Sequence, residues 1–270
     1  MTETRILCTG LAQVESPRWH DDKLWFANWG TQEIRTVDMA GNSDIITKVS
    51  TTLPYSIDWL PDGRMLVVSG QEALLLSQES DGSLVNYADL SALDKVFNEI
   101  VVDAHGNAYV NGGIIALVRP DGSTQKVADH LEFGNGMAIT EDNSTLIVAE
   151  SHGNRLTAFD IQADGSLTNR RVWADLGDGH HPDGICLDSD GAIWYADVPN
   201  KHCVRVREGG EVVRTIDADR GCFACMLGGP GNRTLFMLTA EWHGMDHLDI
   251  TWRTGQILTA DSPAPHAGKP

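Results

Sequence analysis

Apolar and polar positions alternate along this chain in a pattern that repeats. A short, mostly apolar run ends at a polar turn, and a second, almost continuously apolar run of about five residues follows. Continuous apolar runs of this length between turn residues are typical of β-strands that are buried on both faces. The second runs occupy residues 23–27, 64–68, 107–110, 145–149, 192–196 and 234–238.

This unit occurs six times, and one position begins each unit. The head positions are Glu15, Tyr55, Asn98, Asn135, Asp183 and Ala224. Neighbouring heads stand 40, 43, 37, 48 and 41 residues apart, which is the period of a four-stranded propeller blade. Because blades bury their faces only against neighbouring blades, we predict that residues 1–270 form one domain, an all-β, six-bladed β-propeller.

Two further strands have no partner in a blade of their own. Residues 4–8 precede the first unit, and residues 255–259 follow the last one. Pairing of these N- and C-terminal strands would close the ring and remove the exposed edges of an open sheet. The tail at residues 261–270 is rich in proline, so we expect an irregular segment that lies over one face of the ring.

The composition argues against two classes of binding partner, nucleic acids and membranes. A formal net charge of −18 leaves too few cations to neutralise phosphates, so we expect no nucleic acid partner. No apolar run approaches the roughly 20 residues of a membrane span, and residues 1–5 lack the basic start and apolar core of a secretory signal. We therefore expect a cytoplasmic protein that binds a small molecule and needs no membrane. A closed ring also needs no partner protein to protect its edges.

The five cysteines do not form a disulfide framework. Cys8, Cys186 and Cys203 fall in or beside apolar runs, as buried thiols do. Cys222 and Cys225 form a single C-x-x-C pair, and a structural zinc site would need a second pair of ligands at suitable spacing. We interpret these cysteines as packing residues.

Four of the six heads are Glu, Asn or Asp, whose side chains end in carboxylate or amide oxygens: Glu15, Asn98, Asn135 and Asp183. A propeller points the same position of every blade at one central channel, so we expect these four side chains to converge. Such heads could simply bond to one another and to channel water. However, none of the six heads is a cation, so Glu15 and Asp183 would repel each other at close range. Hard oxygen ligands favour calcium, magnesium or manganese; we therefore predict one divalent metal, with Ca²⁺ the first choice and Mg²⁺, Mn²⁺ or Zn²⁺ as alternatives.

Five segments carry a resemblance to a known family. They are residues 15–19, 97–103, 135–139, 182–185 and 225–230, and they follow the family's order along the chain. Together they resemble the signatures of the gluconolactonase, senescence-marker protein and luciferin-regenerating enzyme family. Each motif alone is weakly specific, whereas the ordered set spans nearly the whole chain.

The resemblance implies a six-bladed propeller with one divalent metal in its channel. The family's metal ligands correspond to Glu15, Asn135 and Asp183, and Asn98 corresponds to an Asn that contacts the metal or the substrate. Asp183 also corresponds to the residue that acts as general base or nucleophile. The implied reaction is metal-assisted hydrolysis of a lactone ring.

Three positions depart from the family pattern. Val96 stands where sugar-lactone hydrolases of the family have an Arg, two residues before Asn98. Asn111 stands near the family's acidic substrate contact, and Ser16 replaces a usual Gly. These differences favour a less polar lactone or a related ester over a sugar lactone.

The expected substrate pocket is formed by loop residues and strand ends near the channel mouth. Its predicted members are Tyr55, Val96, Asn111, His152, His181, Phe223 and Trp242. Three other functions stay open at this point: a phosphotriesterase-like hydrolase, a non-catalytic metal-binding propeller, and the bond-forming chemistry of the related strictosidine synthases. The complete ligand set counts against the last of these.

Overall fold

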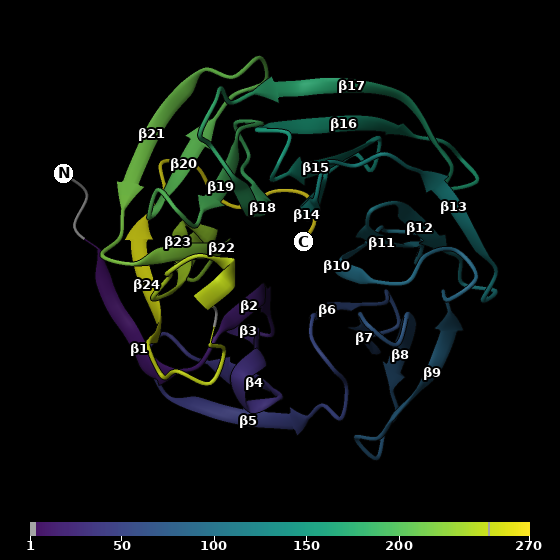
Figure 1. The fold of residues 1–270 in the computed structure, drawn as a ribbon, viewed down its shortest axis with the longest axis horizontal. Helices are drawn as coiled ribbons and strands as arrows, with labels where there is room; N and C mark the ends of the chain where they lie inside the picture. The colour runs from purple at the N-terminus through teal and green to yellow at the C-terminus, as the bar shows by residue number, and fades with distance from the viewer. Residues whose placement is uncertain (1–3, 248) are drawn as a thin grey trace.

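The computed structural model describes residues 4–247 and 249–270, which form six four-stranded antiparallel sheets around a central axis (Figure 1). This confirms the predicted all-β, six-bladed propeller. The strands of blades one to three are β2 (Val14–His20), β3 (Lys23–Asn28), β4 (Glu33–Val37), β5 (Ser43–Lys48), β6 (Tyr55–Trp59), β7 (Met65–Ser69), β8 (Leu74–Gln78), β9 (Leu84–Asp89), β10 (Phe97–Val102), β11 (Ala108–Gly112), β12 (Ile115–Val118) and β13 (Thr124–Ala128). Those of blades four to six are β14 (Gly134–Ile139), β15 (Thr145–Glu150), β16 (Arg155–Ile161), β17 (Leu167–Asp175), β18 (Pro182–Leu187), β19 (Ile193–Asp197), β20 (His202–Val206), β21 (Val212–Asp217), β22 (Gly221–Gly228), β23 (Thr234–Ala240), β24 (Gly255–Asp261) and β1 (Arg5–Leu11).

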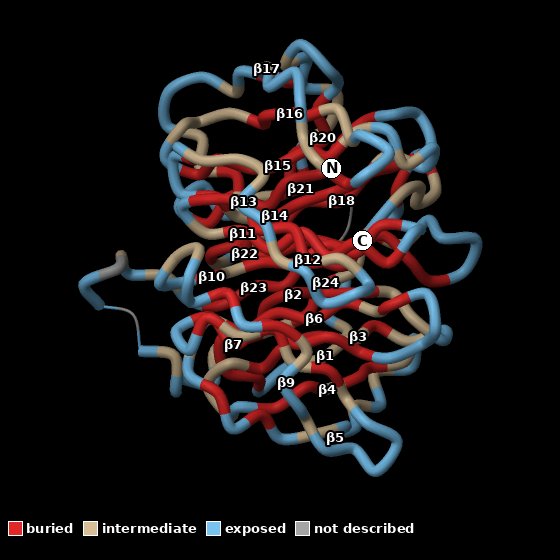
Figure 2. Tube along the Cα trace, turned by 90° about the vertical axis from the view of Figure 1, so that its right-hand side faces the viewer, coloured by how far each residue is buried: buried red, intermediate tan, exposed pale blue. Residues whose placement is uncertain are grey.

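The first strand of each unit lines the centre of the ring. The inner strands β2, β6, β10, β14, β18 and β22 each contact the next one, and β22 contacts β2. Inner and second strands are buried along almost their whole length, whereas the outermost strands alternate between exposed and partly exposed residues (Figure 2). The apolar side chains of the first two or three strands therefore fill the spaces between blades.

Blade six is completed by both ends of the chain. β24 pairs with β23, and the N-terminal β1 pairs with β24 in antiparallel register, with Ile6 opposite Leu258. This confirms the predicted closure of the ring. Because the last sheet contains both terminal strands, the ring does not end in an open blade.

The C-terminal tail crosses the face of the ring opposite to the starts of the inner strands. Ile139 and Lys269 exchange two backbone hydrogen bonds of 2.7 and 2.8 Å, and Asp188 forms a bridge with His266. The C-terminus consequently lies near the centre of the ring (Figure 1). The tail is irregular and lies over one face, as the sequence predicts. In the described part of the chain, no helix is long and apolar enough to cross a membrane.

Candidate metal centre

The residues predicted to hold a metal lie at irregularities in the inner strands. In a β-bulge, two residues of one strand oppose one residue of its partner, which changes the direction of the side chains. The registers of β10, β14 and β18 break at Asn98, Asn135 and Asp183, respectively. The register of β2 breaks directly after Glu15. Four oxygen-bearing side chains from four blades therefore leave the strands at the same level of the ring.

Blade two has no such bulge, and it contributes no ligand. β6 pairs regularly with β7, with Tyr55 opposite Ser69. The Tyr55 side chain is fully buried, and its hydroxyl donates a 3.2 Å hydrogen bond to the Glu33 carbonyl. Burial raises the pKa of this phenol. The prediction that Tyr55 lines the substrate pocket is therefore wrong, because a regular strand directs its side chain between blades.

In blade six the bulge lies one residue earlier than the sequence repeat predicts. The register of β22 breaks between Cys222 and Ala224, so that Phe223 occupies the irregular position. Phe223 is nearly buried and packs edge-to-face on Trp242, with ring centroids 5.9 Å apart. Blade six therefore places an aromatic pair at the mouth of the channel and supplies no metal ligand.

Glycine follows two of the ligand positions because neighbouring inner strands approach closely there. A Cβ atom on Gly136 would lie 2.5 Å from the Asp183 carbonyl oxygen. A Cβ atom on Gly184 would lie 2.6 Å from the Cβ of Ala224. Real Cβ atoms are not found at these distances, so the Asn-Gly and Asp-Gly pairs are needed to bring blades four, five and six together.

The amide of Asn135 connects the ligands of three blades. Its Oδ1 accepts a 3.2 Å hydrogen bond from Asn98 Nδ2, and its Nδ2 lies 3.4 Å from Ser151 Oγ. A side-chain hydrogen bond between Asn135 and Asp183 offsets a small part of the rise in the pKa of that carboxyl. These contacts show that Asn98, Asn135 and Asp183 converge in the channel.

The carboxylates of the channel are buried and close enough to repel one another. Burial, then Asp183, then Glu99 raise the pKa of Glu15 well above its ordinary value. Burial, followed by Glu99 and Asp197, raises the pKa of Asp183 in the same way. Negative groups held this close in a buried site are ionised together only if a positive charge joins them.

The donor set fits a divalent cation. Glu15 and Asp183 would balance its charge, and Asn135 and Asn98 would add amide oxygens. Carboxylate and amide oxygens are the ligands that calcium, magnesium and manganese prefer. The residues present in the channel therefore match the predicted metal in number, charge and chemical type.

A buried ion-pair network supports the channel on the side of blades one to three. Arg18, which is 4% exposed, places Nη2 at 3.1 Å from Glu99 Oε1 and donates to the Ile100 carbonyl at 2.6 Å. Its Nε lies 3.8 Å from Asp58 Oδ1. Sequence reasoning missed this network. The available signal was the presence of the charged residues Arg18 and Asp58 in the mostly apolar first strands of two units.

Ser16 occupies a strained position next to Glu15. Its φ of 49° is in the left-handed region, which glycine adopts without cost. The hydroxyl compensates, because Oγ accepts a 3.0 Å hydrogen bond from Ile57 N and donates a 3.3 Å bond to Glu99 Oε1. Ser16 thus connects blades one, two and three.

Replacing Ser16 with Ala should destabilise the protein by about 1–3 kcal/mol, since the buried Ile57 amide loses its acceptor. Ser16→Gly loses the same hydroxyl but relieves the positive φ, which is worth about 1 kcal/mol. Urea unfolding should therefore rank the proteins as wild type, then Gly, then Ala. Equal loss in the two variants would contradict the strain at this position.

Several predicted pocket residues lie at the end of the ring where the inner strands begin. Val96 precedes β10 and is 47% exposed. His152 is exposed and stacks on Phe133, with centroids 4.6 Å apart. His181 precedes β18, and its Nδ1 lies 3.1 Å from the Ser151 carbonyl. Phe133, which is 50% exposed, was missed by the sequence reasoning because no pattern marks an aromatic residue in that loop.

Asn111 has a different role from the one predicted. Its side chain is fully buried. Oδ1 accepts a 3.2 Å hydrogen bond from Glu99 N, and Nδ2 donates to the Asn135 carbonyl. Asn111 therefore positions the bulges of β10 and β14, and the prediction that it lines the substrate pocket is wrong.

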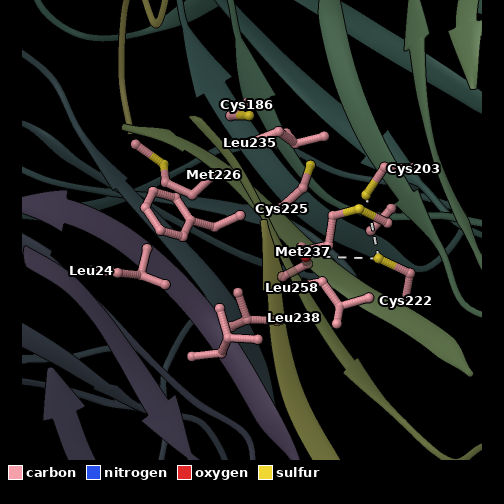
Figure 3. Close-up of a cluster of buried hydrophobic side chains, with 14 of the residues drawn as sticks. Leu24, Cys186, Cys203, Cys222, Cys225, Met226, Leu235, Met237, Leu238 and Leu258 are labelled. Carbon is pink, nitrogen blue, oxygen red and sulfur yellow. Dashed lines mark hydrogen bonds between the residues drawn. The ribbon is translucent and has the colours of Figure 1, made fainter. Parts of the chain in front are cut away.

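Four of the five cysteines belong to the core beneath the site. Cys186, Cys203, Cys222 and Cys225 are buried among apolar side chains of blades five and six (Figure 3). The Sγ atoms of Cys203 and Cys222 lie 3.3 Å apart, and burial raises the pKa of Cys222. The interpretation as packing residues is confirmed for these four; Cys8 is only partly buried.

Comparison with known proteins identifies the family of this chain. The family model described as "SMP-30/Gluconolactonase/LRE-like region" matches residues 14–241. The chain belongs to this family. The match begins one residue before Glu15 and includes every predicted metal ligand, so the resemblance recognised in the sequence is confirmed.

Individual relatives cover most of the chain. Regucalcin of Xenopus laevis is 28% identical over 90% of this chain and 86% of its own length. Pentonolactonase XacC of Haloferax volcanii is 23% identical over 90% of this chain and 87% of its own. Among solved structures, a luciferin-regenerating enzyme superposes with a TM-score of 0.84 at 16% identity over 99% of this chain and 98% of its own. A calcium-binding regucalcin from Agrobacterium tumefaciens superposes with a TM-score of 0.80 at 17% identity, covering 98% and 97% of the two chains.

Proposed function

We propose that this member of the family is a metal-dependent hydrolase that opens a lactone ring or a related ester. The observation that carries the proposal is a set of contacts between inner strands of different blades: Asn98 donates a hydrogen bond to Asn135, Asn135 forms one with Asp183, and Asp183 and Glu15 lie close enough to repel each other. A lactonase among the relatives and a calcium-binding protein among the similar structures support the reaction class and the metal.

Each channel residue has a defined part in this proposal. Glu15, Asn135 and Asp183 would hold the cation, and Asn98 would contact it or the substrate. A bound divalent cation would supply positive charge beside the substrate carbonyl oxygen, where negative charge develops as water attacks.

Asp183 is the residue placed to take the proton of the attacking water. A carboxylate that binds a cation is a weak base, so the bound cation would also have to make the attacking water more acidic before Asp183 could accept its proton. The Asn135 side chain fixes the carboxyl by a hydrogen bond. Proton transfer to Asp183 leaves a hydroxide equivalent to add to the carbonyl carbon, after which the ring C–O bond breaks and the alkoxide is reprotonated.

The rim of the channel mouth favours a substrate that is less polar than a sugar lactone. Its described residues include exposed Val96 and Phe133 and the partly exposed Trp242. No cation stands at position 96 to bind sugar hydroxyl groups. A lactone or ester with an apolar substituent would bury surface against these side chains.

The test is lactone hydrolysis, measured by proton release, on sugar, aliphatic and aromatic lactones. Metal-stripped protein would be compared with protein to which calcium, manganese or zinc has been restored. We expect turnover that returns with the metal and is highest for a lactone without sugar hydroxyls. A metal-bound protein that hydrolyses none of the lactones would contradict the proposal, and turnover of phosphotriesters in its place would identify the alternative hydrolase.

Val96→Arg should raise the ratio of sugar-lactone to aliphatic-lactone turnover by about tenfold, because one charged hydrogen bond is worth about 1.5–3 kcal/mol. Val85→Arg is the matched control, since its side chain is 41% exposed and lies on β9, the outermost strand of blade two. An unchanged ratio in Val96→Arg would show that this position does not determine specificity.

The setting of the reaction is also part of the proposal. With a net charge of −18, the protein would work in the cytoplasm on a small molecule, without nucleic acid, membrane or obligate protein partner. Size-exclusion chromatography of the active protein at several concentrations would test the last point.

A further inference from the structure

A second group of metal-ligating side chains lies in blade five, at the end of the ring where the candidate metal centre is found. His180 is in the loop before β18, Asp197 is the last residue of β19, and His202 is the first residue of β20. Asp197 and His202 are direct partners in the β19–β20 register. Strand pairing and one short loop therefore bring two imidazoles and a carboxylate together.

The distances in this group match those between ligands of one metal ion. His180 Nδ1 lies 3.4 Å and His202 Nε2 lies 3.6 Å from Asp197 Oδ2. All three ligand atoms lie within 4.8 Å of one another. For a tetrahedral ion with bonds of about 2.0–2.2 Å, neighbouring ligand atoms stand about 3.3–3.6 Å apart. The measured distances of 3.4 and 3.6 Å from the two histidine nitrogens to Asp197 Oδ2 are long for direct hydrogen bonds.

One ligand atom lacks any other function in the described structure. His202 Nε2 is buried and has no hydrogen-bond partner. A buried polar nitrogen without a partner is costly, and a metal ion is one of the few groups that would satisfy it here. The His180 and His202 rings are tilted by only 24°, with centroids 6.2 Å apart, so both face the carboxylate from similar directions.

Surrounding groups hold Asp197 in position. Its Oδ2 accepts hydrogen bonds from Asn200 Nδ2 at 2.9 Å and from the His181 amide at 3.2 Å. Burial acts to raise the pKa of Asp197, but the neighbouring His202 imidazole and the hydrogen bonds from Asn200 and His181 lower it overall. The Tyr195 hydroxyl lies 3.1 Å from His180 Nδ1, so this contact would have to be exchanged for the bond from Nδ1 to the ion. An oriented, ionised carboxylate of this kind is typical of metal sites with a formed outer shell.

We propose that His180, Asp197 and His202 bind a second divalent cation, of the zinc, cobalt or nickel class. Nitrogen ligands select these metals over calcium, which prefers oxygen. Three protein ligands leave a fourth position open, and the His180 side chain is 33% exposed, so the ion is reached from solvent. The site is separate from the oxygen-lined channel and does not depend on the lactonase proposal.

The test is binding of Zn²⁺ and Co²⁺ to the full-length, chelator-stripped protein in the presence of excess calcium, which occupies the oxygen-lined channel. We expect one equivalent of zinc by equilibrium dialysis, and with Co²⁺ the visible absorption of a four-coordinate, nitrogen-bound ion. His202→Gln and Asp197→Asn should each weaken binding by about 100-fold or more. The matched control is His105→Gln, which removes an exposed histidine from the turn after β10 and should leave binding unchanged.

Circular dichroism would show whether each variant is folded. If His202→Gln does not fold, His180→Gln provides the same test, because its side chain is in a partly exposed loop. Zinc should also raise the melting temperature of the wild type and not that of His180→Gln. The proposal is overturned if the wild type does not bind zinc stoichiometrically, or if binding persists unchanged in both histidine variants.

Discussion

Asp183→Asn should reduce lactone turnover by about 10³-fold or more while the protein remains folded. The change removes the proton acceptor, and general base catalysis alone typically raises the reaction rate by about 10²–10⁴-fold. It also removes one of the two negative charges that would bind the cation. The fold should persist because the amide occupies the same volume. The amide also relieves the repulsion between Asp183 and Glu15, which raises the pKa of Glu15, and the repulsion from Glu99, which raises the pKa of Asp183. The measurement is kcat at saturating metal, with circular dichroism on the same samples.

Two further measurements separate the roles of Asp183. Calorimetric titration with calcium shows how much of the loss comes from weaker metal binding, because activity at full occupancy reports the missing base alone. Asp44→Asn is the control, since it makes the same chemical change at an exposed position of the outer strand β5 and should keep full activity. Substantial activity in Asp183→Asn at full metal occupancy would remove Asp183 from its role as base.

Arg18→Met should lower the free energy of unfolding by about 3–5 kcal/mol. The methionine fills much of the space but leaves two buried carboxylates, Glu99 and Asp58, without their cation. Loss of one partner from a buried ion pair costs about this much because the other charge stays buried. Glu99 and Asp58 are 9% and 6% exposed, so water cannot replace the guanidinium. Urea or thermal unfolding would measure the change.

A surface ion pair gives the matched control. Arg207, at 54% side-chain exposure, contacts Glu211 at 3.1 Å, and Arg207→Met should cost less than about 1 kcal/mol. The double variant Arg18→Met with Glu99→Gln should recover part of the lost stability, since it removes one of the unpaired charges. If Arg18→Met and Arg207→Met were equally stable, the network around Arg18 would not support the channel.

Much of the site follows from positions in the repeat. Glu15, Asn98, Asn135 and Asp183 were recognised because each begins a unit whose strand must reach the same level of the ring. Tyr55 and Asn111 were misplaced for a related reason. The repeat marks equivalent positions, but it does not reveal whether a strand carries a bulge, and only a bulge turns the side chain toward the channel. β6 has none, and Asn111 lies on β11, whose side chains pack between neighbouring inner strands.

The sequence by itself determined the fold class, the number of blades, the closing strand pair and the four candidate ligand positions, because each depends on local periodicity or on a repeated position. Only the tertiary structure decided which charges meet. Arg18, Asp58 and Glu99 come from three blades, and His180, Asp197 and His202 come from a loop and two strand ends. Contacts of this kind depend on register and on the approach of neighbouring blades, and a single sequence carries no pattern that encodes them.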